Sequence, residues 1–131
     1  MMNTENKQAG YSTKTYPVPT KRYYQTMELK NDPELIKEYV KRHSAEEFWS
    51  IIGEGIRSVG ILDMEIFIFE NKLFMIVEAP VDFDWDSAFA QLARKPKQAE
   101  WEDYMSIFQD CGEGLSSAEK WQLMDRIFHL Y

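Results

Sequence analysis

Apolar residues recur along the chain with two different periods, and the change of period separates predicted strands from predicted helices. In residues 21–29 apolar and polar positions alternate, which is the period of a half-buried strand. Residues 62–69 and 73–79 also have strand character, and the polar residues 70–72 between them indicate a tight hairpin turn. A fourth strand is predicted over residues 123–130.

Helical spacing begins directly after the first predicted strand. Asp32 suits the cap of a helix and Pro33 its first position. This helix is predicted to continue through residues 51–52, with a break near Gly53 and Gly55.

Two further helices are predicted after the hairpin. Asp82 or Asp84 can cap the first of them, and the second covers residues 97–109, after the break at Pro96. Residues 116–120 are interpreted as a polar connector to the last strand.

The predicted order is strand, helix, strand, strand, helices, strand, which is the split βαβ or ferredoxin-like α+β fold. This fold lays its helices on one face of the sheet. Strands two and three carry large apolar residues on both faces, so we expect a second copy to cover the bare face in a homodimer, a dimeric α/β barrel. Residues 1–20 are polar and without periodicity, which predicts a disordered or loosely ordered leader before a single domain over residues 21–131.

Composition narrows the classes of function. The 131 residues carry a net charge of −7, which disfavours partners such as nucleic acid or anionic membrane. No apolar run is long enough for a membrane helix, and the first residues lack a signal-peptide pattern, so we expect a cytoplasmic protein. Cys111 is the single cysteine, and the two histidines, His43 and His129, lie at opposite ends of the chain, so no metal site is expected.

Candidate chemistry starts with Tyr39 and His43, which lie four residues apart and share one face of the first predicted helix. A histidine beside a tyrosine at the edge of an apolar face is a candidate for proton transfer, because imidazole exists in both protonation states near neutral pH. The same spacing suits an ordinary helix histidine, and the pattern leaves both interpretations open. Trp101 and Tyr104 likewise fit either a core stripe or a binding surface.

The segment Glu38-Tyr39-Val40-Lys41-Arg42-His43 resembles the Glu-Tyr-x-x-Arg-His signature of the L-rhamnose mutarotase family. Residues 71–78, 98–105 and 127–130 resemble the third strand, the tryptophan-bearing helix and the closing strand of that family, in the same order. The likeness covers about residues 22–131. It implies a homodimeric ferredoxin-like enzyme that interconverts the α and β anomers of a deoxy-hexose such as L-rhamnose without a cofactor.

The resemblance also implies roles for individual residues. His43 corresponds to the general acid, Tyr39 to a substrate ligand, and Trp101 to the first tryptophan of a pair that stacks on the sugar. Two positions depart from the family: the second tryptophan is Glu102, and the tyrosine of strand two is Met64. Met64 and Glu102 are therefore predicted substrate contacts that alter the pocket rather than the acid.

Two other functions fit the same fold, because a fold does not fix a function. A small cofactor-free monooxygenase would consume oxygen with an aromatic substrate, and a non-catalytic sugar-binding relative would bind its ligand without His43. Mutarotation needs a base and an acid, and the candidates for a second proton carrier beside His43 are Glu78 and Glu102.

Overall fold

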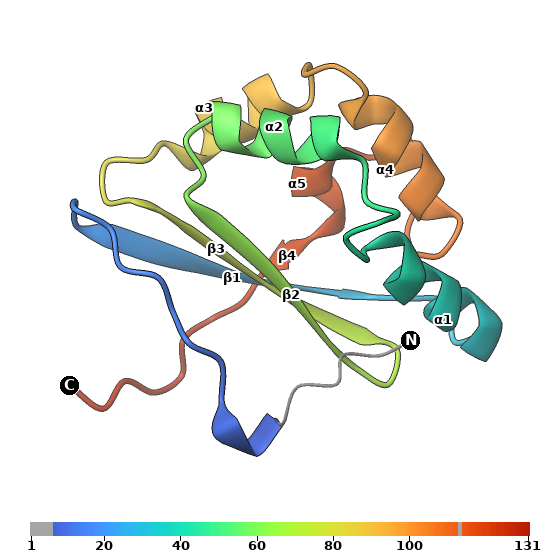
Figure 1. Ribbon diagram of the computed structural model, residues 1–131, viewed down its shortest axis with the longest axis horizontal. Helices are drawn as coiled ribbons and strands as arrows, with labels where there is room; N and C mark the ends of the chain where they lie inside the picture. The colour runs from blue at the N-terminus through green and yellow to red at the C-terminus, as the bar shows by residue number, and fades with distance from the viewer. Residues whose placement is uncertain (1–6, 113) are drawn as a thin grey trace.

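A four-stranded antiparallel sheet in the order β2-β3-β1-β4 forms the centre of the computed structural model, which describes residues 7–112 and 114–131 (Figure 1). Its strands are β1 (Thr20–Glu28), β2 (Asp63–Phe69), β3 (Lys72–Pro80) and β4 (Gln122–Leu123). β3 lies between β1 and β2 and is antiparallel to both, so β1 and β2 run in the same direction. This is the split βαβ arrangement, and the predicted ferredoxin-like fold is confirmed.

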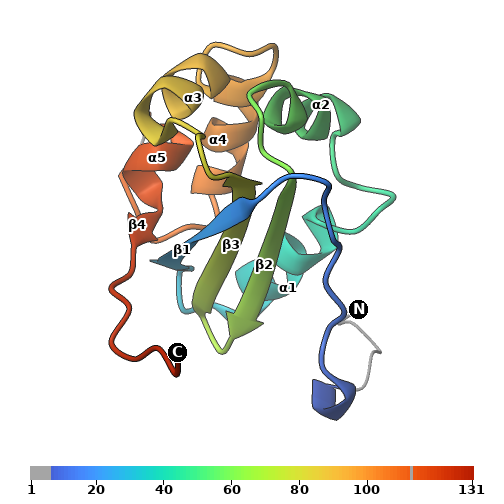
Figure 2. The ribbon, with the colours of Figure 1, turned by 90° about the vertical axis from the view of Figure 1, so that its left-hand side faces the viewer.

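The helices lie on one side of this sheet. They are α1 (Pro33–Arg42), α2 (Ser50–Ser58), α3 (Trp85–Leu92), α4 (Gln98–Ser106) and α5 (Ser117–Lys120), and a short 3₁₀ helix, η1 (Lys7–Ala9), precedes β1. In both views α2, α3, α4 and α5 lie above the sheet, while η1 and the C-terminal tail lie below it (Figure 1, Figure 2).

Alternation along the strands decides which side chains enter the core. In β1, Gln25 and Met27 are buried beneath the helices, whereas Arg22 and Tyr24 point to the opposite face and are exposed. The core is completed by apolar residues from β3 and the helices, among them Ile52, Leu73, Met75, Val77, Phe89, Leu92, Met105, Phe108 and Trp121. A site can therefore form between this covered face of the sheet and the helices.

The first helix begins as predicted but ends earlier. Asp32 Oδ1 accepts hydrogen bonds from the amides of Glu34 and Leu35 at 2.9 and 3.3 Å, and α1 then ends at Arg42. The prediction of a break near Gly53 and Gly55 is wrong, because the break covers residues 43–49 and both glycines lie inside α2.

Packing explains both the early end of α1 and the position of the two glycines inside α2. Phe48 and Trp49, in the segment between the helices, turn inward onto Trp101, with ring centroids 5.2 and 5.1 Å apart. Gly55 allows α2 to approach the chain after α3, since a β-carbon there would lie 3.3 Å from Lys95 Cβ. Gly55 therefore serves a close packing contact of α2 rather than a helix end.

The predicted last strand over residues 123–130 is also largely wrong. β4 contains only Gln122 and Leu123, which pair with β1, and one further bond joins the Met124 amide to the Tyr24 carbonyl at 2.8 Å. β4 is an edge strand with β1 as its one neighbour, and the chain leaves β1 after Met124. The apolar tail beyond it is left exposed, with Ile127 at 96% and Tyr131 at 98%.

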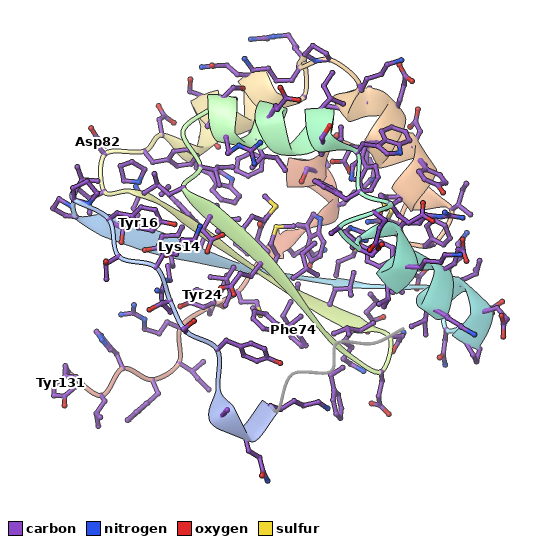
Figure 3. All side chains as sticks on the ribbon, viewed as in Figure 1. Lys14, Tyr16, Tyr24, Phe74, Asp82 and Tyr131 are labelled. Carbon is purple, nitrogen blue, oxygen red and sulfur yellow. The ribbon has the colours of Figure 1, made fainter. Side chains whose placement is uncertain are left out.

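The predicted leader lies partly outside the described residues, since residues 1–6 are not covered. Within residues 7–19 the side chains are mostly exposed, but three contacts join the segment to the domain. The Tyr16 hydroxyl donates to the Leu62 carbonyl at 3.3 Å, the Tyr11 ring meets Phe67 at 5.3 Å, and the Pro19 carbonyl accepts from Val81. Figure 3 shows Tyr16 where the segment passes the sheet.

Candidate active site

The last turn of α1 positions Tyr39 and His43 on its inner face. Their rings lie 4.4 Å apart, and His43 Nδ1 lies 2.8 Å from the Tyr39 carbonyl oxygen. A carbonyl can only accept, so Nδ1 carries the proton and donates it. In the neutral imidazole this leaves Nε2 as the nitrogen with an available lone pair.

Burial sets the protonation state of this imidazole. The pKa of His43 is lowered from its ordinary 6.5 chiefly because burial disfavours the charged form, and the bond to the Tyr39 carbonyl opposes this only in part. His43 is therefore neutral at pH 7. The pKa of the Tyr39 phenol is raised, also mainly by burial, so Tyr39 keeps its proton.

An aromatic frame fixes the position of the His43 ring. Trp101 meets it edge-on at 5.5 Å and Phe48 stacks on it at 6.3 Å, and the Phe48 and Trp101 rings also contact each other at 5.2 Å. Trp101 is in turn packed by Trp49 at 5.1 Å. Contacts of this kind restrict the ring to one orientation, which a proton-transfer group needs.

A cavity of about 490 Å³ lies between the covered face of the sheet and the helices. The five residues predicted for the site all line it: Tyr39, His43, Met64, Trp101 and Glu102. The exposed side chains of Lys14 and Arg57 line it as well, so the cavity reaches the surface. Lys14 belongs to the N-terminal segment, where Figure 3 labels it.

The two candidates for a second proton carrier occupy different places. Glu78 accepts from Thr20 Oγ1 at 2.7 Å and pairs with exposed Arg22 at 3.4 Å, on the sheet face away from the helices. Glu102 is buried at the cavity wall, so of these two candidates it is Glu102 that lines the cavity with His43.

Sequence reasoning missed two residues that hold Glu102. Lys120 Nζ donates to Glu102 Oε1 at 2.9 Å and to the Glu102 carbonyl at 2.6 Å, and Gln98 Nε2 donates to Glu102 Oε2 at 2.7 Å. Lys120 reaches this position because residues 116–120, the predicted connector, form α5. The signal was in the chain: Ser116 and Glu119 have the spacing of a capping box, which predicts a helix start.

Other types of site find less support within the described residues. No three His, Cys, Asp or Glu side chains there come close enough to hold a metal ion. Cys111 is a free thiol in the loop that follows α4. In the same part of the chain, no helix has both the length and the apolar character to span a bilayer.

Comparisons with known proteins identify the family. A family profile described as rhaM, L-rhamnose mutarotase, matches residues 22–130. A UPF0734 protein of Dictyostelium discoideum is 37% identical over 114 residues, covering 84% of this chain and 90% of its own length. An L-fucose mutarotase of Xanthomonas campestris is 32% identical over 104 residues, covering 79% of this chain and 83% of its own length.

A solved structure has a fold similar to that of this chain. The crystal structure of an L-rhamnose mutarotase from Formosa agariphila superposes with a TM-score of 0.63 at 19% identity, covering 85% of this chain and 99% of the other. At this level of identity the similarity concerns the arrangement of strands and helices.

Proposed function

This chain belongs to the L-rhamnose mutarotase family, and from that premise we propose that it interconverts the α and β anomers of a deoxy-hexose, with His43 as the proton carrier. Rhamnose and fucose mutarotases are isomerases that act on sugars, and the chain is an isomerase of this kind. The observation that carries the proposal is the His43 tautomer: Nδ1 is bound to the Tyr39 carbonyl in the wall of a cavity of about 490 Å³.

The reaction opens and recloses a hemiacetal ring. Neutral His43 accepts the proton of the anomeric hydroxyl at Nε2, the bond between C1 and the ring oxygen breaks, and C1 becomes an aldehyde carbon. The imidazolium then donates its proton to the former ring oxygen. Rotation about the bond from C1 to C2 and the reverse steps close the ring on the other face of the carbonyl.

One imidazole can serve both oxygens, because they are bonded to the same carbon atom. His43 then acts first as the base and afterwards as the acid, which includes the acid role that the sequence resemblance implies. A positioned group of this kind contributes on the order of 10²- to 10⁴-fold to the rate. Under this proposal the reaction needs no second proton carrier, and Glu102 is a substrate contact.

The rest of the cavity suits a small polyol. Trp101 offers an aromatic surface of the kind that packs on the face of a sugar ring. Tyr39, buried and protonated, has a hydroxyl that can hydrogen-bond the substrate. Met64 adds apolar surface on the sheet side, which fits the methyl group of a 6-deoxy sugar.

The function is tested by saturation-transfer NMR on the wild-type protein with L-rhamnose, L-fucose and other 6-deoxy-hexoses. Irradiation of one anomeric proton is expected to reduce the signal of the other anomer in proportion to enzyme concentration for at least one sugar. Sugar binding without any anomer exchange would leave only the binding-protein alternative. Oxygen consumption with an aromatic compound, and no exchange, would favour the monooxygenase.

We also propose a homodimer in which a second copy covers the bare sheet face. That face carries exposed Tyr24 and Phe69, and Phe74 lies on it as well (Figure 3). The exposed apolar tail over residues 124–131 lies on the same side of the sheet (Figure 1, Figure 2). A patch of this extent on an isolated chain is typical of a surface that packs against another protein.

A further inference from the structure

The side chain of Arg57, an exposed residue of α2, folds back along its own helix. The β-carbon that Gly53 lacks would lie 3.3 Å from Arg57 Nη1 and 3.7 Å from Nη2, so the guanidinium lies against the backbone one turn earlier. Both residues line the cavity that holds His43. A glycine inside a helix is destabilising relative to alanine, and here the missing side chain makes room for the guanidinium at the cavity wall.

The protein does not use the hydrogen-bond donors of this guanidinium. Glu54 lies three residues before Arg57 on the same helix, a spacing that suits an ion pair. Arg57 nevertheless forms no ion pair and no side-chain hydrogen bond with the residues that the structure describes. A guanidinium carries five N–H donors and no acceptor, arranged in a planar fork. These donors are therefore available to a ligand in the cavity.

The guanidinium lies one aromatic ring away from His43. The β-carbon that Gly53 lacks would also lie 3.5 Å from Phe48 Cε2, and the Phe48 ring stacks on the imidazole with centroids 6.3 Å apart. Arg57 is exposed, whereas Tyr39 on the other side of the imidazole is buried. A sugar whose anomeric carbon lies at His43 would therefore extend its outer edge toward Arg57.

We propose that Arg57 is a substrate-binding residue that donates two hydrogen bonds to the oxygens of two neighbouring ring hydroxyls of the sugar; this inference rests on the proposed function. Hydroxyl oxygens accept hydrogen bonds, and two of them on adjacent ring carbons suit the two terminal nitrogens of the fork. Arg57 thereby selects sugars by the position of this hydroxyl pair. Gly53 is a positioning residue, because it acts through the location of the guanidinium.

The test compares Arg57→Met and Arg57→Lys with Arg94→Met. Arg94 is an exposed arginine that does not line the cavity, so it controls for the loss of one surface charge. Anomer exchange is measured by saturation transfer for the preferred 6-deoxy-hexose and for analogues that each lack one ring hydroxyl. Rates at several sugar concentrations separate KM from kcat, and circular dichroism checks the fold of each variant.

We expect Arg57→Met to raise KM for the full sugar by about 5- to 50-fold with little change in kcat, because the lost contacts are not to the reacting atoms. Arg57→Lys keeps the charge but loses the fork, so its KM should lie between those of the wild type and Arg57→Met. Two analogues, lacking hydroxyls on adjacent carbons, should show a smaller effect of Arg57→Met than the full sugar does. Arg94→Met should match the wild type with every sugar.

A change at Gly53 separates binding from folding. Gly53→Ala should raise Tm, because alanine is favoured inside a helix. Its methyl group should displace the guanidinium and raise KM by about 2- to 10-fold. In protein that already carries Arg57→Met, the same substitution should leave KM unchanged. Damage to the fold would not combine higher stability with weaker binding.

The inference is overturned if KM in Arg57→Met equals that of the wild type, or if it rises by one common factor for all analogues. A wild-type KM in Arg57→Lys would overturn it as well, because a point charge would then be sufficient. These outcomes refute only the role of Arg57 as long as the wild-type protein exchanges anomers. If the wild-type protein exchanges no sugar at all, the proposed function fails and this inference fails with it.

Discussion

At the scale of single residues, the decisive feature is the hydrogen bond from His43 to the backbone of its own helix. The Tyr39 carbonyl accepts from Nδ1 at 2.8 Å, and this one contact leaves Nε2 as the nitrogen that can accept a proton. The spacing of Tyr39 and His43 could be predicted from the sequence, because residues four apart on a helix share a face. The tautomer could not, because it depends on the exact path of the backbone where α1 ends.

The pH dependence of catalysis follows from this imidazole. Partial burial lowers the pKa of His43 below 6.5, so the base form predominates at pH 7 and is lost as the pH falls through the lowered pKa. The enzyme-dependent exchange rate should change little from pH 7 to pH 8 and fall to half at a pH below 6.5. Saturation transfer across this range, with the spontaneous rate subtracted, provides the measurement. A midpoint at or above 6.5 would be inconsistent with a buried, neutral base.

Gln98 and Lys120 mark the limit of sequence reasoning about the site. Both are ordinary polar residues in the sequence, and neither belongs to a recognisable motif with His43. Only the fold brings α4 and α5 together and makes Glu102 a shared partner of the two. The departure from tryptophan to Glu102 was visible in the sequence, but the lysine that accompanies it lies 18 residues away.

At the scale of elements, the predictions held where the signal was local. The cap at Asp32 and the hairpin from β2 to β3 depend on neighbouring residues, and both are confirmed. The predicted path of the chain between α1 and α2 was wrong, because Phe48 and Trp49 pack on Trp101, a contact that no local pattern shows. The last strand is shorter than predicted: its alternation is real, but its pairing with β1 ends at the bond from the Met124 amide to the Tyr24 carbonyl.

The ion pair that joins α4 and α5 should have a measurable effect on the free energy of unfolding. Lys120 and Glu102 form an ion pair whose side chains are 0% and 10% exposed. Lys120→Met removes one charge and leaves the other buried, which should lower the free energy of unfolding by about 3–5 kcal/mol. Urea unfolding at pH 7 measures this loss.

A double variant separates the charge from the packing. In Glu102→Gln with Lys120→Met neither charge remains, so most of the lost stability should return. A loss below about 1 kcal/mol in the single variant, or no recovery in the double variant, would contradict the view that the pair is a buried unit.

At the scale of the whole molecule, the two faces of the sheet differ in what covers them. The helices cover one face of the sheet, and the family assignment drawn from residues 38–43 is confirmed by the profile over residues 22–130. The other face exposes the apolar side chains of Tyr24 and Phe69, and the tail exposes several more. The homodimer was predicted from this imbalance in the sequence, and it stays a prediction, because the structure contains one chain.

A single charge should disrupt the proposed dimer. Phe74 is at the centre of the bare face, since it pairs with Thr26 on one side and Phe67 on the other. Phe74→Glu should convert a particle of twice 15.5 kDa into one of 15.5 kDa, as measured by light scattering after gel filtration. Ala90→Glu, on an exposed position of α3, serves as the control and should leave the mass unchanged. A wild-type protein that is already monomeric at micromolar concentration would contradict the proposal.

The most direct test of the central claim is the rate of anomer exchange at pH 7 in His43→Asn, compared with the wild type and with His129→Asn. His129 is exposed in the tail, so it controls for the substitution itself. His43→Asn should fold normally and lose about 10²- to 10⁴-fold of the enzyme-dependent rate, while His129→Asn keeps it. Equal exchange in His43→Asn and the wild type would show that the imidazole in the cavity is not the proton carrier.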